Sequence, residues 1–191
     1  PRTTRRASSR SPTRGRSLRG GPAPTRTLRV EKLDLLHPYD VQNALNWAID
    51  ILVNNAATNP TMAQAIDVDE RAWDSIMNLN LKGLFFLSQT VARAMREKGG
   101  GRIINVSSVA GITPDLLPLY SISKAGVNMA TKVMAQQWAQ YNIRVNAIAP
   151  GLTKTRFSEA LWKNPDILKM AMFKTPMKRP AEPEEMVGAI I

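Results

Sequence analysis

Three short apolar runs between residues 51 and 148 have the pattern of strands buried in a parallel sheet. They lie at 51–53, 103–106 and 143–148, and most of their apolar residues are β-branched. Strands that are covered on both faces read as near-continuous apolar runs of this length. We therefore predict three strands here, and a further strand or strand end at 31–36.

The segments between these runs have helical spacing. Leu84, Leu87 and Val91 recur at intervals of three and four residues, which places them on one face of a helix. Asp69 has the side chain of a helix N-cap, and the glycines at 99–101 end the same helical region. The predicted helices cover 41–49, a start near 72, 79–98, 120–140, 157–174 and a last segment after 183.

This alternation predicts an α/β protein with a parallel sheet, helices on both faces and right-handed crossovers. In such sheets, ligands bind beyond the carboxyl ends of the strands. The three runs end in polar or turn-forming residues at 54–57, 107–108 and 150–151, and a loop is expected at 109–119. We therefore expect the chemistry of the chain along one edge of the sheet.

Tyr120 and Lys124 have the spacing of two side chains on one helix face, with about 5–6 Å between their Cβ atoms. An ammonium that close stabilises a phenolate, so we expect it to lower the pKa of Tyr120 from about 10 towards neutral pH. A phenol tuned in this way is a general acid for a carbonyl or a general base for an alcohol. The same spacing also occurs by chance on amphipathic helices, and its weight comes from the polar segments around it.

The composition argues against several other kinds of site. The 191 residues include no cysteine and one histidine, His37, which excludes disulfides and thiolate metal sites and argues against zinc, so no metal is predicted. No apolar run has the length of a membrane span. A cytoplasmic protein with no membrane partner is the expectation.

The net charge of +11 belongs to one segment. Residues 1–30 hold nine arginines and no acidic residue, which leaves 17 basic and 15 acidic residues for the rest. This Arg/Ser/Pro-rich arm has few apolar residues and is predicted to be disordered, followed by one partial domain at 31–191. Three interpretations stay open: an arm that binds nucleic-acid phosphates, an organellar transit peptide, or sequence from a fragment, fusion or shifted frame.

Six segments occur in an order and at spacings that resemble the short-chain dehydrogenase/reductase superfamily. They span about residues 48–191 and read DILVNNAA, NLNLKG, GGRIINVSS, YSISKAG, NIRVNAIAPG and RPAEPEEM. The resemblance implies a Rossmann-like, doubly wound parallel sheet in three layers. It also implies an oxidoreductase that interconverts a carbonyl and a secondary alcohol of a small molecule, with NAD or NADP as the cofactor.

The resemblance implies a role for each matching catalytic residue. Tyr120 would donate and accept the proton, and Lys124 would lower the pKa of Tyr120 and bind the nicotinamide ribose. Ser108 would hydrogen-bond the substrate oxygen as its charge develops, with Ser107 as the alternative. Asn80 would bend its helix and hold a water that links Lys124 to solvent, or would serve as a helix cap alone.

The same resemblance implies cofactor-binding residues along the predicted edge. Asn54 would brace the sheet, Ala56 would contact the cofactor through its backbone, and a turn would lie beside the nicotinamide. Two threonines would bind the carboxamide, or are ordinary loop residues. The complete set is Asn54, Ala56, Tyr120, Lys124, Pro150, Gly151, Thr153 and Thr155.

Residues 157–174 occupy the place of the family's mobile lid over the substrate. Its large side chains are either lid or core residues, namely Trp162, Met170, Met172 and Phe173.

The sequence departs from the family at both ends. The glycine-rich turn, whose backbone approaches the cofactor pyrophosphate at a helix N-terminus, has no match before Asn54. The last strand and its glycine-rich tail have no match either. The resemblance therefore predicts an incomplete sheet, truncated at both ends, whose exposed edges favour aggregation.

Three functions are therefore compatible with the sequence. The first is the oxidoreductase, and the second is a catalytically inactive, truncated remnant that assembles with a sibling chain. The third is a nucleic-acid binder, against which the nearly neutral charge of residues 31–191 argues. In the family, the helices at 80–98 and 120–141 pack against a partner, so a homodimer or homotetramer is expected.

Overall fold

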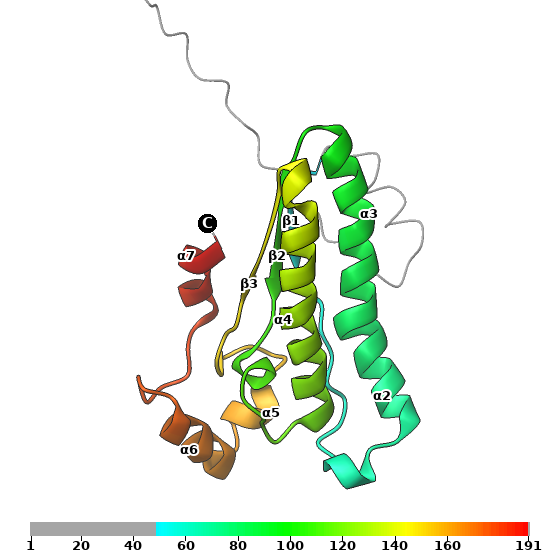
Figure 1. Cartoon of the computed structure of the whole chain (residues 1–191). Coiled ribbons are helices and arrows are strands. Elements are labelled where there is room, and N and C mark those ends of the chain that lie inside the picture. The colour runs from blue at the N-terminus through cyan, green and yellow to red at the C-terminus, as the bar shows by residue number, and fades with distance from the viewer. Residues whose placement is uncertain (1–48, 191) are drawn as a thin grey trace, which may run out of the picture. The chain divides into compact units, whose positions relative to one another are not determined.

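The computed structural model describes residues 49–190, which contain a three-stranded parallel sheet. The strands are β1 (Ile51–Asn54), β2 (Gly101–Val106) and β3 (Ile143–Ile148), and they lie side by side in that order (Figure 1). Asn54 pairs with Asn105, and Val106 pairs with Ile148. The three predicted strands are confirmed, with β3 at the predicted bounds and β2 beginning two residues early.

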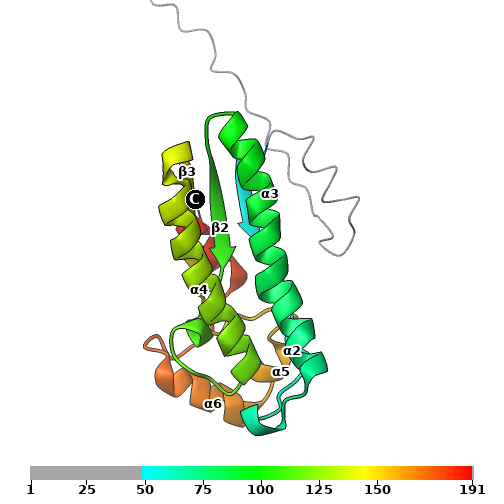
Figure 2. The ribbon, with the colours of Figure 1, turned by 45° about the vertical axis from the view of Figure 1, so that its right-hand side comes forward.

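Two long helices, α3 (Leu84–Glu97) and α4 (Pro118–Trp138), lie beside each other on one face of this sheet (Figure 2). The core forms between them and the strands. Its buried residues include Leu52, Leu84, Leu87, Val91, Met95, Ile103, Val127, Met134, Ile143 and Val145.

The opposite face of the sheet is less covered within residues 49–190. Ile51 and Val53 are about half exposed, whereas Leu52 and Asn54 between them are buried. The prediction of a strand buried on both faces is therefore wrong for β1 in the described part of the chain. Both long helices lie on one side, so alternate residues of β1 have no comparable cover.

The helical region before β2 begins where the sequence predicts. The Asp69 side chain accepts a hydrogen bond from the Ala72 backbone N–H at 2.8 Å and caps α2 (Glu70–Met77). A π-helical segment, η2 (Asn78–Gly83), joins α2 to α3, so the predicted helix at 79–98 is part of a longer one. Gly99 and Gly100 end it with φ values of 93° and 138°, which favour glycine.

The other helical elements are short, and α6 is the longest of them. Helix α4 starts two residues before the prediction, and the predicted 157–174 segment divides because Asn164 caps a new helix whose first residue is Pro165. The last predicted helix begins as 3-10 turns. These elements are η1 (Ala65–Asp67), η3 (Val109–Gly111), η4 (Ala139–Tyr141), α5 (Glu159–Trp162), α6 (Pro165–Lys174), η5 (Pro183–Met186) and α7 (Val187–Ile190).

Several predictions lie outside the described residues. They are the strand at 31–36, the helix at 41–49, His37, and the arm at 1–30 with its boundary to the domain. Within residues 49–190, no helix is both long and apolar enough to cross a membrane.

Candidate active site

The segments that follow β2 and β3 meet beyond the carboxyl edge of the sheet. The Ser107 backbone N–H donates to the Ile148 carbonyl at 2.8 Å, and the Val109 N–H donates to the Pro150 carbonyl at 3.0 Å. These bonds continue the pairing of the two strands into their turns. The polar segments at 107–108 and 150–151 are therefore neighbours, as parallel strands require.

Tyr120 lies in the first turn of α4 and meets the turn after β2. Its phenol lies close enough to the side chain of Ser108, the residue that precedes η3, for hydrogen bonding from Ser108 to lower the phenol pKa. The Phe157 ring packs against the phenol ring with 6.0 Å between centroids and an interplanar angle of 40°. A phenol, a hydroxyl and an apolar wall thus converge at one point.

The electrostatics of Tyr120 differ from the prediction. Burial raises the pKa of Tyr120 above its usual 10.0, and the hydrogen bond with Ser108 opposes that rise. The Lys124 ammonium lies 5.5 Å from the centre of the phenol ring and donates to the Val106 carbonyl instead. The expected fall of the Tyr120 pKa below 10 is therefore wrong, because burial has the larger effect.

Lys124 is itself an unusual lysine. Its side chain is buried, with 2% of the residue exposed, and the Nζ–Val106 O distance is 2.7 Å. Burial lowers the pKa of Lys124 to about 8, because a charged ammonium loses hydration there. An amine that titrates near neutral pH beside a phenol is typical of a proton-transfer site.

The geometry distinguishes the two adjacent serines. The buried Ser107 hydroxyl donates to the Lys124 carbonyl of α4 at 3.2 Å, so it faces the helix backbone. The Ser108 hydroxyl accepts from the Ala110 N–H at 3.1 Å and meets the Tyr120 phenol. The contact with the phenol supports Ser108 rather than Ser107 as the residue beside the reacting oxygen.

Asn80 lies in the π-helical segment η2 and is fully buried. Its amide oxygen accepts from the Thr58 N–H at 2.8 Å, and its amide nitrogen donates to the Thr58 carbonyl at 3.0 Å. The same nitrogen donates to the Ser123 hydroxyl at 3.1 Å, and Ser123 donates to the Tyr120 carbonyl at 2.8 Å. Asn80 therefore joins the loop after β1 to the start of α4.

Asn54 belongs to a buried polar network that the sequence did not reveal. Its amide nitrogen donates to the Asn105 side-chain oxygen and to the Ser88 hydroxyl, each at 2.8 Å. Asn105 in turn donates to the Thr131 hydroxyl at 2.8 Å. These bonds join β1, β2, α3 and α4. The bracing expected of Asn54 thus depends equally on Asn105, whose polar side chain inside an apolar strand was the available signal.

The other predicted cofactor-binding residues are more exposed. Ala56 and Gly151 are exposed, and a Cβ placed on Gly151 would have no heavy atom within 4 Å. The Thr153 hydroxyl donates to the Gly151 carbonyl at 3.2 Å. The Thr155 hydroxyl bonds to the Ser158 hydroxyl at 3.0 Å, and the Thr155 carbonyl accepts from the Trp162 indole at 3.1 Å.

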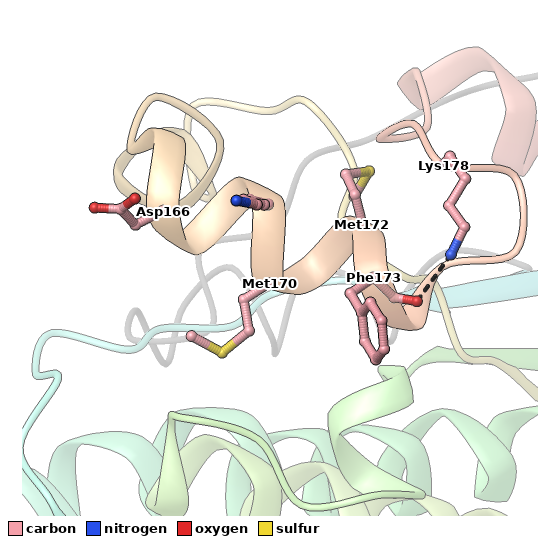
Figure 3. A pocket seen from close by; sticks show the side chains of 6 residues that line it. Asp166, Met170, Met172, Phe173 and Lys178 are labelled. Atoms are coloured by element: carbon pink, nitrogen blue, oxygen red, sulfur yellow. Dashed lines mark hydrogen bonds between the residues drawn. The ribbon is translucent and has the colours of Figure 1, made fainter.

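The predicted lid carries Met170 and Phe173 on the surface, whereas Trp162 and Met172 are half-buried. Phe173 is 82% exposed and Met170 48%, so neither belongs to the core. Both point from α6 towards the ribbon beneath it, while Lys178 donates to the Phe173 carbonyl at 2.9 Å (Figure 3). The cavity beside α6 has a volume of about 540 Å³ and is lined by Met170, Met172 and Phe173 together with the charged residues Asp166, Lys169 and Lys178.

Comparison with known proteins identifies the family. The short chain dehydrogenase family model matches residues 26–166. Dehydrogenase/reductase SDR family member 4 of Oryctolagus cuniculus is 40% identical over 147 residues, which are 76% of this chain and 56% of that protein. The 2-dehydro-3-deoxy-D-gluconate 5-dehydrogenase of Dickeya dadantii (strain 3937) is 40% identical over 145 residues, 75% of this chain and 57% of that protein.

Solved structures agree with this assignment. A putative 2-deoxy-D-gluconate 3-dehydrogenase from Agrobacterium tumefaciens, with bound NADP, has a TM-score of 0.76 and 34% identity. The similarity covers 82% of this chain and 65% of that one. An NAD⁺-bound xylitol dehydrogenase has a TM-score of 0.75 and 26% identity, and covers 83% and 69% of the two chains.

The chain therefore belongs to the short-chain dehydrogenase family, and its α/β fold with a parallel sheet is that of the family. It spans about half the length of the curated relatives it matches. The sequence-based recognition of the family is confirmed.

Proposed function

We propose that this chain contains the proton-transfer half of an NAD(P)-dependent oxidoreductase that interconverts a carbonyl and a secondary alcohol. The observation that carries this proposal is the proximity of the Tyr120 phenol to the Ser108 side chain and to the buried ammonium of Lys124. It lies beyond the carboxyl ends of parallel strands, where α/β proteins bind their ligands. The oxidoreductases among the relatives support the same reaction class.

Tyr120 is the group that carries the proton. With its pKa raised by burial, the phenol holds its proton at neutral pH, which suits donation to a carbonyl oxygen during reduction. Ser108 lies against the phenol, so an oxygen that accepts from both hydroxyls would have its developing negative charge stabilised. In the reverse direction, Tyr120 takes the proton of the alcohol after it has lost its own proton and become a phenolate.

Lys124 and Asn80 support this phenol in different ways. The Lys124 ammonium places a positive charge near the ring, which stabilises a phenolate when it forms. Asn80 makes hydrogen bonds to Thr58 and Ser123, which hold the loop after β1 against the helix of Tyr120. We assign Asn80 a positioning role on these contacts.

The residues at this edge fit the nicotinamide end of the cofactor. Ala56 and Gly151 are exposed, and a Cβ on Gly151 would meet open space, which leaves room at these strand ends. The resemblance adds Tyr120, Lys124, Pro150, Thr153 and Thr155 to the residues that would hold the nicotinamide end. When bound, the nicotinamide supplies or accepts the hydride. Among residues 49–190, no glycine-rich turn leads from a strand into a helix to hold the pyrophosphate.

The Phe157 ring, which packs against the Tyr120 ring, favours a substrate with an apolar group next to its carbonyl. A polyol hydroxyl against that ring would lose water without gaining a polar partner from it. The gluconate dehydrogenases among the relatives act on more polar compounds by name, so a ketone panel with both kinds of substrate is informative.

A homo-oligomer is proposed from the outward faces of the two long helices. Phe86 on α3 and Ile122, Met129 and Val133 on α4 are exposed apolar residues. Burial of such side chains in a dimer or tetramer would be favourable. Analytical ultracentrifugation of the full chain tests this, and a monomer at micromolar concentration would contradict it. Cytoplasmic localisation stays a prediction.

The second candidate is a remnant without catalysis, the alternative that the sequence leaves open. A fluorescence titration of the full chain with NADH and NADPH separates the two functions, followed by carbonyl reduction assays. The enzyme proposal expects saturable binding of one or both cofactors and turnover of a carbonyl. Absence of saturable binding at millimolar cofactor would favour the remnant and reject the enzyme.

A further inference from the structure

One face of α4 contacts the turn after β2 over three successive helical turns. Tyr120, Lys124 and Asn128 follow each other at intervals of four residues, so their side chains lie on the same face. The first two belong to the candidate active site. Asn128 has no part in the chemistry proposed above, although its side chain is turned to the same segment of chain.

Each turn of this face makes a specific bond to residues 106–111. The backbone carbonyl of Lys124 accepts a hydrogen bond from the Ser107 hydroxyl at 3.2 Å, and its ammonium donates one to the Val106 carbonyl at 2.7 Å. One helical turn further, the Asn128 amide nitrogen donates to the Gly111 carbonyl at 3.0 Å. Ser108 lies between these two attachment points.

The attachment at Gly111 requires a close approach of two backbones. A Cβ on Gly111 would lie 2.5 Å from the Lys124 carbonyl carbon and 2.8 Å from the Ala125 nitrogen. Only glycine avoids that overlap, so η3 rests directly on the helix backbone. Without the Asn128 bond at its far end, this segment would be hydrogen-bonded to the middle of α4 only at its near end, through Val106 and Ser107.

We propose that Asn128 is a positioning residue, which holds the 108–111 turn against α4 so that the Ser108 hydroxyl meets the Tyr120 phenol. Asn128 acts through the Gly111 carbonyl and touches neither the phenol nor the reacting oxygen. The proposal rests on the function proposed above, because the pair that Asn128 aligns is the proposed catalytic pair.

The alignment can be measured without turnover, through the titration of Tyr120. The bond from Ser108 lowers the pKa of the buried phenol, so loss of that bond must raise it. The full chain is labelled with 3-fluorotyrosine, a more acidic phenol that titrates where the protein stays folded, and is followed by ¹⁹F NMR. The chain has three tyrosines, and Tyr120→Phe identifies the resonance.

We expect Asn128→Leu and Asn128→Ala to raise the Tyr120 pKa in the same direction as Ser108→Ala. The effect should disappear when Ser108→Ala is already present, because both changes remove the same hydrogen bond. The matched control is Gln136→Leu, which exchanges an exposed amide two turns further along the same helix and should leave the titration unchanged. Circular dichroism at each pH checks that the variants stay folded.

Three results would overturn the proposal. One is a wild-type Tyr120 pKa in both Asn128 variants, and another is no rise in Ser108→Ala itself. The third is an equal rise from Asn128→Leu with or without Ser108, which would mean that Asn128 acts by another route. None of these results depends on a cofactor, so failure of the enzyme proposal in the NAD(P)H titration is a separate outcome.

Discussion

Residues 49–148 and residues 149–190 are held in place by different forces. Within the described chain, every buried apolar side chain belongs to the first region. The second region has one buried residue, Ser158, whose hydroxyl accepts from the Thr155 N–H at 3.2 Å and donates to the Thr153 carbonyl. Its other ties include a backbone bridge between Thr153 and Ala181 and exposed ion pairs, such as Lys154–Glu182 at 2.7 Å and Arg179–Glu185 at 2.6 Å.

The two regions suit different tasks, namely the positioning of the proposed catalytic residues and the admission of a substrate. Tyr120, Ser108 and Lys124 stand on the packed region, where side chains keep their positions to the precision that proton transfer needs. The second region contributes Phe157 and the apolar face of α6, and exposed ion pairs add little stability. Segments with few buried contacts open at low free-energy cost, which suits a part of the site that must admit a substrate.

The largest effect is expected in the packed region. Ile103→Ala removes a fully buried side chain from β2, and a cavity of that kind lowers the free energy of unfolding by roughly 2–5 kcal/mol. Urea unfolding, followed by circular dichroism, measures the change. A loss below about 1 kcal/mol would contradict the assignment of the core to this region.

A somewhat smaller loss is expected from the buried polar network. Asn105→Ala leaves the Asn54 amide and the Thr131 hydroxyl without one partner each, which costs about 1–3 kcal/mol. The exposed Asn146 on β3 offers the matched control, Asn146→Ala. Equal stabilities of the two variants in urea would show that the network is not what braces the strands.

The lowered pKa of Lys124 predicts that the free energy of unfolding rises with pH. At pH 7 the Lys124 amine is protonated in both the native and the unfolded protein. Above about pH 8 the native protein releases this proton, while the unfolded chain keeps it until about pH 10.5. The unfolded state then binds more protons, so the free energy of unfolding gains a contribution that rises with pH.

The wild type minus Lys124→Met difference in unfolding free energy isolates this contribution. It should become more favourable to the wild type between pH 7 and about 9.5, below the range in which tyrosines titrate. If this difference in unfolding free energy stays flat or falls with pH, burial does not lower the pKa of Lys124 in the native protein.

The smallest effect on stability is expected in the second region. Phe173→Ser exchanges an exposed side chain of α6, so the free energy of unfolding should change by less than about 0.5 kcal/mol. If α6 contacts substrate, the same variant should raise KM for an apolar ketone and leave cofactor affinity unchanged. A large loss of stability would show that α6 is packed more firmly than the structure indicates.

The sequence predicted the elements whose pattern is local. The bounds of β3, the cap at Asp69 and the glycine stop after α3 depend on neighbouring residues, and all three are confirmed. The break between α5 and α6 had a readable signal in Asn164 followed by Pro165.

Features that depend on residues far apart in the chain were not predictable. The π-helical turns of η2 surround Asn80, whose partner Thr58 lies 22 residues earlier. The direction of the Tyr120 pKa depends on burial and on where the Lys124 ammonium points, and spacing alone says nothing of either. The contact of Phe157 with Tyr120 likewise joins residues 37 positions apart.

The central claim is that the Tyr120 phenol transfers the proton, and one comparison tests it most directly. Carbonyl reduction by NADH and NADPH is measured for the full chain and for Tyr120→Phe, with the affinity for each cofactor measured in parallel. The account predicts a rate lower by about 10²–10⁴-fold in the variant, with cofactor affinity unchanged. Turnover by Tyr120→Phe at the wild-type rate would contradict it.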